Sequence, residues 1–192
     1  MTDYVTDNPR FAGSVLRYHT WPTIQRQTVG EHCWQIALIH EQIFGTLEHD
    51  VERFIRHHDT AELRVGDPPF PVKSQNGDMK AAYDRIEPKA LQDMGINPLP
   101  ELIDRDRIRI KVCDLLEMMC FGMIEVEMGN ALGVPIVIRT ERAATKLSHT
   151  ELSATDDVCV QNFIYEAWAR HENVLKLKDP MIYNYEERNK LL

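Results

Sequence analysis

Helical periodicity constrains this chain more than any other feature, because apolar residues recur every three or four positions and alternating, strand-like runs are scarce. This spacing predicts an all-α protein, folded as a single helical-bundle domain over residues 1–192. The first helix carries a capping box, in which Thr28 is the N-cap and Glu31 follows three residues later. The predicted helices cover residues 29–44, 50–65, 78–94, 103–128, 136–147 and 156–173.

The charge of the chain limits its partners. The formal net charge is −8, and there is no long basic run, so the chain is poorly suited to coating a nucleic-acid backbone. No stretch approaches the roughly 20 apolar residues that cross a bilayer, and the first residues lack the basic start and apolar run of a secretory signal. We therefore expect a cytoplasmic protein without a membrane or nucleic-acid polymer as partner. A small anionic substrate would need local positive charge from Lys, Arg or a metal.

The four cysteines form no C-x-x-C pair and lie in apolar surroundings. We therefore expect buried free thiols and no structural zinc site built from thiolates. Trp34 and Trp168 are expected to serve packing rather than binding. The cysteines are Cys33, Cys113, Cys120 and Cys159.

Polar residues interrupt the apolar stripe of the second predicted helix. The stripe begins with Val51 and Ile55 and continues, in steps of three and four, through His58 and Glu62. Asp59 lies beside this stripe. A buried carboxylate is costly unless it is paired or bound to a metal, so these positions indicate a compensating partner.

Two other predicted helices show the same anomaly. His32 shares a face with Ile36, and Asp114 shares a face with Ile110. Taken singly, a histidine on an apolar face is usually a hydrogen-bonded core residue, and Asp114 could cap a helix or pair with a basic side chain. Taken jointly, two histidines and two aspartates on three helices suit one mononuclear metal site.

The candidate ligands are His32, His58, Asp59 and Asp114, a set of nitrogen and oxygen donors. Such a set favours Mn, Fe, Co, Ni or Zn over calcium or magnesium. Four protein ligands on a six-coordinate ion leave two positions for water or a substrate oxygen, as catalysis requires.

Two further carboxylates are candidates for acid–base chemistry. Glu62 lies one helical turn beyond His58 and could orient or deprotonate an attacking water. Asp67 follows Gly66 and precedes two prolines, so a rigid loop could hold it as a second acid–base group. A turn aspartate is the alternative interpretation of Asp67.

Three segments together resemble the HD superfamily of metal-dependent phosphohydrolases. The match is closest to the bacterial 5'-deoxynucleotidases and to related phage nucleotide hydrolases that act on dATP. The segments are residues 17–32, residues 58–73 with H-D-x-x-E and G-D-x-P-x-P-V-K, and residues 110–114 with a later E-x-x-x-G-N at residues 125–130. The resemblance implies an all-helical bundle that forms dimers or larger homo-oligomers.

The same resemblance assigns roles to individual residues. It implies that His32, His58, Asp59 and Asp114 are metal ligands, that Glu62 and Asp67 are catalytic, and that Arg17 contacts the substrate phosphate. In the bacterial 5'-deoxynucleotidases a tryptophan usually follows this arginine, whereas here Tyr18, His19 and Thr20 follow it. The base preference therefore stays open. No histidine lies between His58 and His149, which favours a mononuclear over a binuclear site.

These observations predict hydrolysis of a (deoxy)nucleoside 5'-phosphate to nucleoside and phosphate. Arg17, Tyr18, Thr20 and Lys73 are the candidate substrate contacts, although Tyr18 could be a packing residue and Lys73 a solvated one. One alternative is a dNTP triphosphohydrolase that releases nucleoside and triphosphate, with Arg26, Lys73 or Lys80 near the outer phosphates. A non-catalytic nucleotide sensor is a second alternative, which the presence of Glu62 and Asp67 disfavours.

Overall fold

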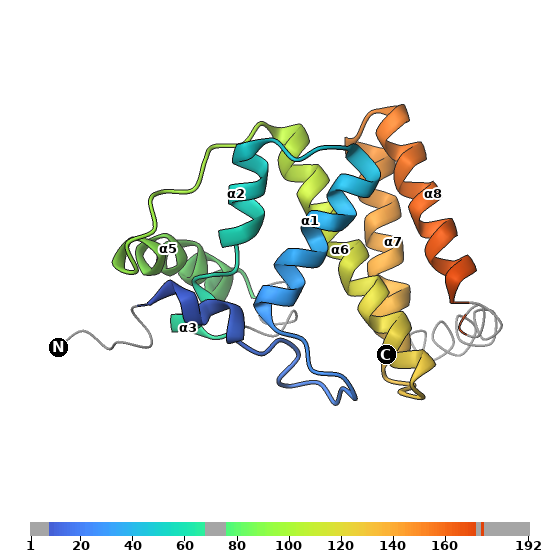
Figure 1. Cartoon of the computed structure of the whole chain (residues 1–192), viewed down its shortest axis with the longest axis horizontal. Coiled ribbons are helices and arrows are strands. Elements are labelled where there is room, and N and C mark those ends of the chain that lie inside the picture. The colour runs from blue at the N-terminus through green and yellow to red at the C-terminus, as the bar shows by residue number, and fades with distance from the viewer. Residues whose placement is uncertain (1–7, 68–75, 172–173, 175–192) are drawn as a thin grey trace. The chain divides into compact units, whose positions relative to one another are not determined.

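The computed structural model describes residues 8–67, 76–171 and 174, and within these it is helical, without a named strand. The predicted all-α class is therefore confirmed (Figure 1). The described residues fall into two compact units, and the division lies inside the first long helix. The first unit lies within Met1–Pro22, Arg26–Ala37 and Leu47–Leu102, and the second within Thr23–Gln25, Leu38–Thr46 and Ile103–Leu192. The elements are η1 (Pro9–Ser14), α1 (Val29–Phe44), α2 (His49–His57), α3 (Glu62–Val65), α5 (Gly77–Asp93), α6 (Asp104–Glu127), α7 (Gly133–Glu151) and α8 (Ala154–Arg170).

The start of α1 follows the predicted capping box. The Thr28 hydroxyl accepts the backbone N–H of Glu31 at 3.2 Å, and the Glu31 carboxylate accepts the backbone N–H of Thr28 at 2.7 Å. Two backbone donors of the helix start are thereby satisfied. The observed helix, Val29–Phe44, matches the predicted range.

In the first unit, the short helix α3 packs against α5 and η1. A small core of Ala61, Ala90, Leu91 and Met94 forms there, and Leu63, Ile96 and Leu99 cover it. The Arg64 guanidinium pairs with the Asp93 carboxylate at 2.9 Å, which ties α3 to the last residue of α5. The region around α3 is thus held by both apolar and ionic contacts.

The predicted continuous helix over residues 50–65 is wrong in its middle. A turn at residues 58–61 separates α2 from α3. Within it, the backbone N–H of Thr60 bonds the His57 carbonyl and that of Glu62 bonds the Asp59 carbonyl, so the bonds close after three residues. His58 itself keeps α-helical dihedrals and donates its backbone N–H to the Phe54 carbonyl, so the tightening of the chain begins after it.

The second unit is built on α6, α7 and α8, which run side by side in Figure 1. The prediction for α6 is confirmed within one residue at each end. Helix α7 begins at Gly133, earlier than predicted, because Pro135 is accommodated in the first turn, where its missing N–H needs no partner. Arg109 of α6 holds Asp156 of α8 through hydrogen bonds of 2.7 to 3.1 Å.

All four cysteines are free, as predicted. Cys33 and Cys113 are buried as expected, whereas Cys120 and Cys159 are only partly buried. Burial raises the pKa of the Cys120 thiol to about 12. Trp168 is buried as expected, but Trp34 is 67% exposed, so its predicted packing role is wrong. Trp34 lies two positions after His32 on α1, and a shift of two residues places its side chain on the opposite side of the helix from the buried stripe.

Among the described residues, none of the helices combines the length and apolar character needed to cross a bilayer.

Candidate metal centre

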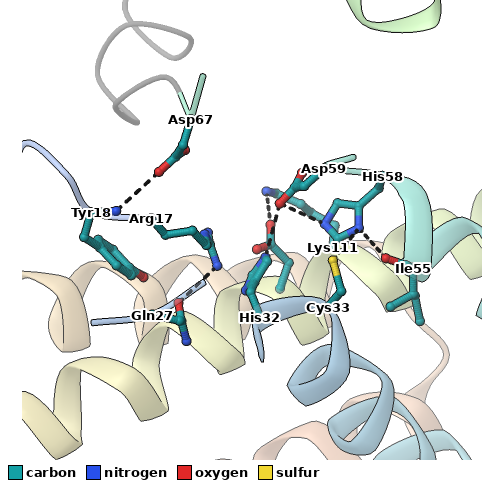
Figure 2. Close-up of polar contacts among 11 residues, drawn as sticks. Arg17, Tyr18, Gln27, His32, Cys33, Ile55, His58, Asp59, Asp67 and Lys111 are labelled. Carbon is teal, nitrogen blue, oxygen red and sulfur yellow. Dashed lines mark hydrogen bonds and ion pairs between the residues drawn. The ribbon is translucent and has the colours of Figure 1, made fainter. Parts of the chain in front are cut away.

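Three of the four predicted ligands lie together in the first unit. The Asp59 Oδ2 atom lies 3.6 Å from His32 Nε2 and 3.4 Å from His58 Nε2. One ligand atom from each residue lies within 4.8 Å of the others, so the three side chains could hold a metal ion. Figure 2 shows both imidazoles directed at the Asp59 carboxylate.

The local fold fixes the positions of these histidine nitrogens. His32 is fully buried on α1, on the same face as the buried Ile36. The His58 Nδ1 atom lies 2.7 Å from the Ile55 carbonyl oxygen, which can only accept, so Nδ1 carries the proton. Nε2 of His58 is then the basic nitrogen, and it faces Asp59. A backbone carbonyl that fixes the tautomer in this way is typical of metal-binding histidines.

The packing and exposure of His58 and Asp59 are also compatible with a bound metal. The Phe54 ring stacks on His58 with centroids 6.4 Å apart and planes 9° from parallel. The His58 and Asp59 side chains keep 18% and 20% exposure, so solvent or a substrate can reach the cluster. One buried and one partly exposed imidazole, together with one carboxylate, fit a divalent transition metal.

Asp114 belongs to α6 in the second unit. Its Oδ2 atom accepts a hydrogen bond from the Lys111 ammonium at 2.6 Å, and its side chain is 16% exposed. Its role as the fourth ligand stays a prediction.

Glu62 is the first residue of α3 and is 6% exposed. Its backbone N–H donates to the Asp59 carbonyl at 3.0 Å, so the turn that carries the candidate ligands His58 and Asp59 leads directly into it. The predicted burial of this carboxylate is confirmed, and its catalytic role stays a prediction.

Asp67 contacts the loop that follows η1. Its Oδ2 atom accepts the backbone N–H of Tyr18 at 3.3 Å and lies 4.0 Å from His19 Nδ1. Burial raises the pKa of Asp67, and the nearby Arg17 charge opposes that rise only in part. Asp67 is therefore a carboxyl that retains its proton to higher pH than an ordinary aspartate does.

Arg17 is held by Gln27. The backbone N–H of Arg17 donates to the Gln27 carbonyl at 2.9 Å, and its guanidinium lies 3.4 Å from the Gln27 side-chain oxygen. Figure 2 shows Arg17 directed toward the His32 side of the cluster. Gln27 is 4% exposed, and no pattern in the sequence distinguishes it, although it lies within segment 17–32.

Tyr18 adopts the left-handed conformation, with φ +55°, and is the one non-glycine residue with positive φ among those the structure describes. This conformation costs a tyrosine about 1–2 kcal/mol, and it directs the Tyr18 N–H to Asp67. Thr20 is exposed on the same loop. Lys73, the last predicted substrate contact, lies outside the described residues.

The family model of the YfbR-like 5'-deoxynucleotidases matches residues 14–132, which include every candidate site residue. A 5'-deoxynucleotidase of Shewanella oneidensis is 29% identical over 106 residues, which cover 49% of this chain and 54% of the relative. The chain therefore spans about half the length of that relative. A 5'-deoxynucleotidase of Pectobacterium atrosepticum is 29% identical over 169 residues, which cover 74% of this chain and 84% of the relative.

A solved structure has a similar fold. The HD phosphohydrolase DatZ of cyanophage S-2L, bound to dA and one catalytic Zn²⁺ ion, superposes with a TM-score of 0.63. The superposition covers 90% of this chain and 98% of the phage chain, at 18% sequence identity. This likeness shows that the chain shares the helical fold of that phage protein.

Proposed function

Because the chain belongs to the YfbR-like 5'-deoxynucleotidase family, we propose that it hydrolyses deoxynucleoside 5'-monophosphates to deoxynucleoside and phosphate. The observation that carries this proposal is the convergence of His32 and His58 on Asp59, with the His58 tautomer fixed by the Ile55 carbonyl. The family and the candidate metal site both imply metal-assisted hydrolysis of a phosphate ester.

The proposed metal ligands are His32, His58, Asp59 and Asp114. A bound divalent ion would neutralise charge on the phosphate oxygens and make a water more acidic. For Asp114 to ligate, its carboxylate has to exchange the Lys111 ammonium for the ion. Two imidazoles and a carboxylate favour Zn, Mn, Fe, Co or Ni.

The proposed substrate contacts lie on the loop after η1 and beyond Asp67. Arg17 is the phosphate ligand, because its guanidinium is held by Gln27 and can present parallel N–H donors to an anion. Tyr18 and Thr20 would contact the sugar or the base, and Lys73 the phosphate. Tyrosine instead of the usual tryptophan at position 18 leaves the base preference to experiment.

Glu62 and Asp67 have complementary proposed roles. Glu62 takes a proton from the attacking water while the water oxygen forms its bond to phosphorus. The bond from phosphorus to the sugar 5' oxygen breaks, and Asp67 gives its proton to that oxygen. The raised pKa of Asp67 supports the role of donor, because the carboxyl then carries a proton over a wider pH range.

A substrate panel tests the proposed function. The purified protein is loaded with Co²⁺, Mn²⁺ or Zn²⁺ and incubated with the four deoxynucleoside monophosphates, their ribonucleotide counterparts and dATP. We expect orthophosphate and nucleoside from the deoxynucleoside monophosphates. Inorganic triphosphate from dATP, without turnover of dAMP, would replace the proposal by a triphosphohydrolase. Tight binding without any product would indicate a nucleotide sensor.

We also propose that the chain assembles with itself as a dimer or larger oligomer. Helix α8 exposes Val158 and Tyr165, which are 57% and 75% accessible and lie seven residues apart on one helical face. Light scattering coupled to size exclusion measures the assembled mass, and a monomer at micromolar concentration would contradict this proposal.

A further inference from the structure

Residues 15–29 form a closed loop that carries the proposed substrate contacts Arg17 and Tyr18, and we call it the substrate loop. Its base is a single antiparallel bridge. Leu16 pairs with Thr28, the Arg17 N–H donates to the Gln27 carbonyl at 2.9 Å, and the Val29 N–H donates to the Val15 carbonyl at 2.9 Å.

Apolar burial does not hold the far end of this loop. Trp21 is 39% exposed and Ile24 is 58% exposed, so neither side chain anchors it in a core. A loop tip without buried side chains depends on its backbone hydrogen bonds for a fixed position. Residues 23–25 of the loop belong to the second unit, where those bonds are found.

Glu125, in the last turn of α6, supplies the bonds. Its two carboxylate oxygens accept the backbone N–H groups of Ile24 and Gln25, each at 2.8 Å. The Asn130 side chain donates to the same carboxylate at 2.6 Å. Glu125 is 1% exposed, so a buried carboxylate is devoted to two consecutive backbone donors at the loop tip.

The charge state of Glu125 suits this task. Burial by itself would raise the pKa of the carboxyl, but the hydrogen bonds from Asn130, Ile24 and Gln25 outweigh it and lower the pKa. Glu125 is therefore ionised at neutral pH, and hydrogen bonds to a charged acceptor are stronger than those to a neutral one.

We propose that Glu125 is a positioning residue for substrate binding, which fixes the tip of the substrate loop and thereby the conformation from which Arg17 and Tyr18 contact the nucleotide. This inference rests on the proposed function of Arg17 and Tyr18. Glu125 acts through the backbone of residues 24–25 and does not itself touch the substrate. Its effect is therefore expected on substrate affinity more than on the chemical step.

The test compares Glu125→Ala and Glu125→Gln with Glu151→Gln, a matched control at an exposed glutamate that ends α7. The first measurement is amide hydrogen exchange of residues 24 and 25 by NMR, which needs no activity. We expect faster exchange at both amides in Glu125→Ala, an intermediate effect in Glu125→Gln, which keeps one acceptor oxygen, and wild-type exchange in Glu151→Gln.

The second measurement is the steady-state kinetics of the metal-loaded enzyme. We expect KM for the deoxynucleotide to rise about tenfold in Glu125→Ala, the order expected for losing a hydrogen bond to a charged group, with a smaller change in kcat. Glu125→Gln should recover part of the affinity, which a general folding defect would not produce.

Each outcome has a separate meaning. Unchanged exchange at residues 24 and 25 would overturn the anchoring by Glu125, whatever the activity. Faster exchange with an unchanged KM would overturn its link to substrate binding. If Glu125→Ala does not fold, Glu125→Gln decides both points. Absence of hydrolysis in the wild-type protein would refute the proposed function while leaving the exchange result valid.

Discussion

The carbonyl oxygen of Gly122 lies 2.7 Å from the position that a Cβ atom on Gly133 would occupy. Gly122 belongs to α6 and Gly133 begins α7, so the two helices meet there backbone against backbone. A Cβ at Gly122 would in turn lie 2.9 Å from the Val137 side chain.

Gly133→Ala should therefore destabilise the fold. Because the obstructing atom is backbone, the helices have to separate, and overpacking of this kind costs about 1–3 kcal/mol. Urea unfolding followed by circular dichroism measures the change. The control is Gly77→Ala, at the start of α5, where nothing lies within 4 Å of the added methyl and stability should be kept. Equal stability of the two variants would mean that the helices do not pack this closely.

Removal of a metal ligand should reduce metal affinity. We expect His32→Ala to bind Co²⁺ or Mn²⁺ at least about tenfold more weakly. Losing a residue that only hydrogen-bonds to a metal ligand already weakens metal binding by about that factor. His49→Ala, at a histidine that is 85% exposed, is the control. Calorimetric titration measures affinity, and chelation followed by metal addition should abolish and restore hydrolysis. Asp114→Asn examines the fourth ligand, and wild-type affinity in that variant would remove it from the set.

Glu62→Gln should slow turnover while metal stays bound. The amide cannot accept the proton of the attacking water, and a lost general base typically lowers kcat by about 10²–10⁴. Metal content by elemental analysis should match the wild type, since Glu62 is not a proposed ligand. Glu48→Gln, at an exposed residue before α2, should turn over normally. Wild-type kcat in Glu62→Gln would remove Glu62 from the mechanism.

The pH profile should report Asp67. As a proton donor, Asp67 supports the reaction only while it is protonated, so kcat/KM should fall as pH rises through its pKa. Burial raises that pKa, so this limb should lie above the range of an ordinary aspartate. In Asp67→Asn the activity should drop and the limb should disappear. A profile of unchanged shape in Asp67→Asn would assign the titration to another group.

His40 should make the protein sensitive to acid. It is 4% exposed, and burial together with the Arg109 charge lowers its pKa to about 4, against opposing effects of Asp106 and Asp156. The unfolded chain takes up a proton near pH 6.5, whereas the folded chain does so only near pH 4. The contribution of neutral His40 to the free energy of unfolding is therefore fully present above pH 6.5. It is lost as pH falls from 6.5 to about 4, which lowers the stability by up to roughly 3 kcal/mol.

His40→Leu should flatten this decline. The comparison is the slope of unfolding free energy against pH between 6.5 and 4, measured in urea for both proteins. A parallel slope in the variant would show that other groups cause the acid sensitivity.

Sequence periodicity predicts the long helices well, because α1, α5 and α6 each repeat apolar residues over several turns and start or stop at clear signals. It fails at residues 58–61, since a tight turn and a helical turn share nearly the same spacing over four residues. The clustering of His32, His58 and Asp59 could be predicted because polar residues on an apolar stripe need a partner. The roles of the Gln27 and Ile55 carbonyls could not be predicted, because hydrogen bonds to backbone oxygens leave no pattern in the sequence.

The buried thiol of Cys113 gives the second unit a built-in chemical reporter. It is fully enclosed on α6, and burial raises its pKa far above the usual range, so alkylating reagents cannot reach a reactive thiolate while the helices stay packed. The rate at which the Cys113 thiol is alkylated, followed by mass spectrometry, therefore measures how often α6 opens locally from the helices packed against it. The measurement needs neither substrate nor metal ion.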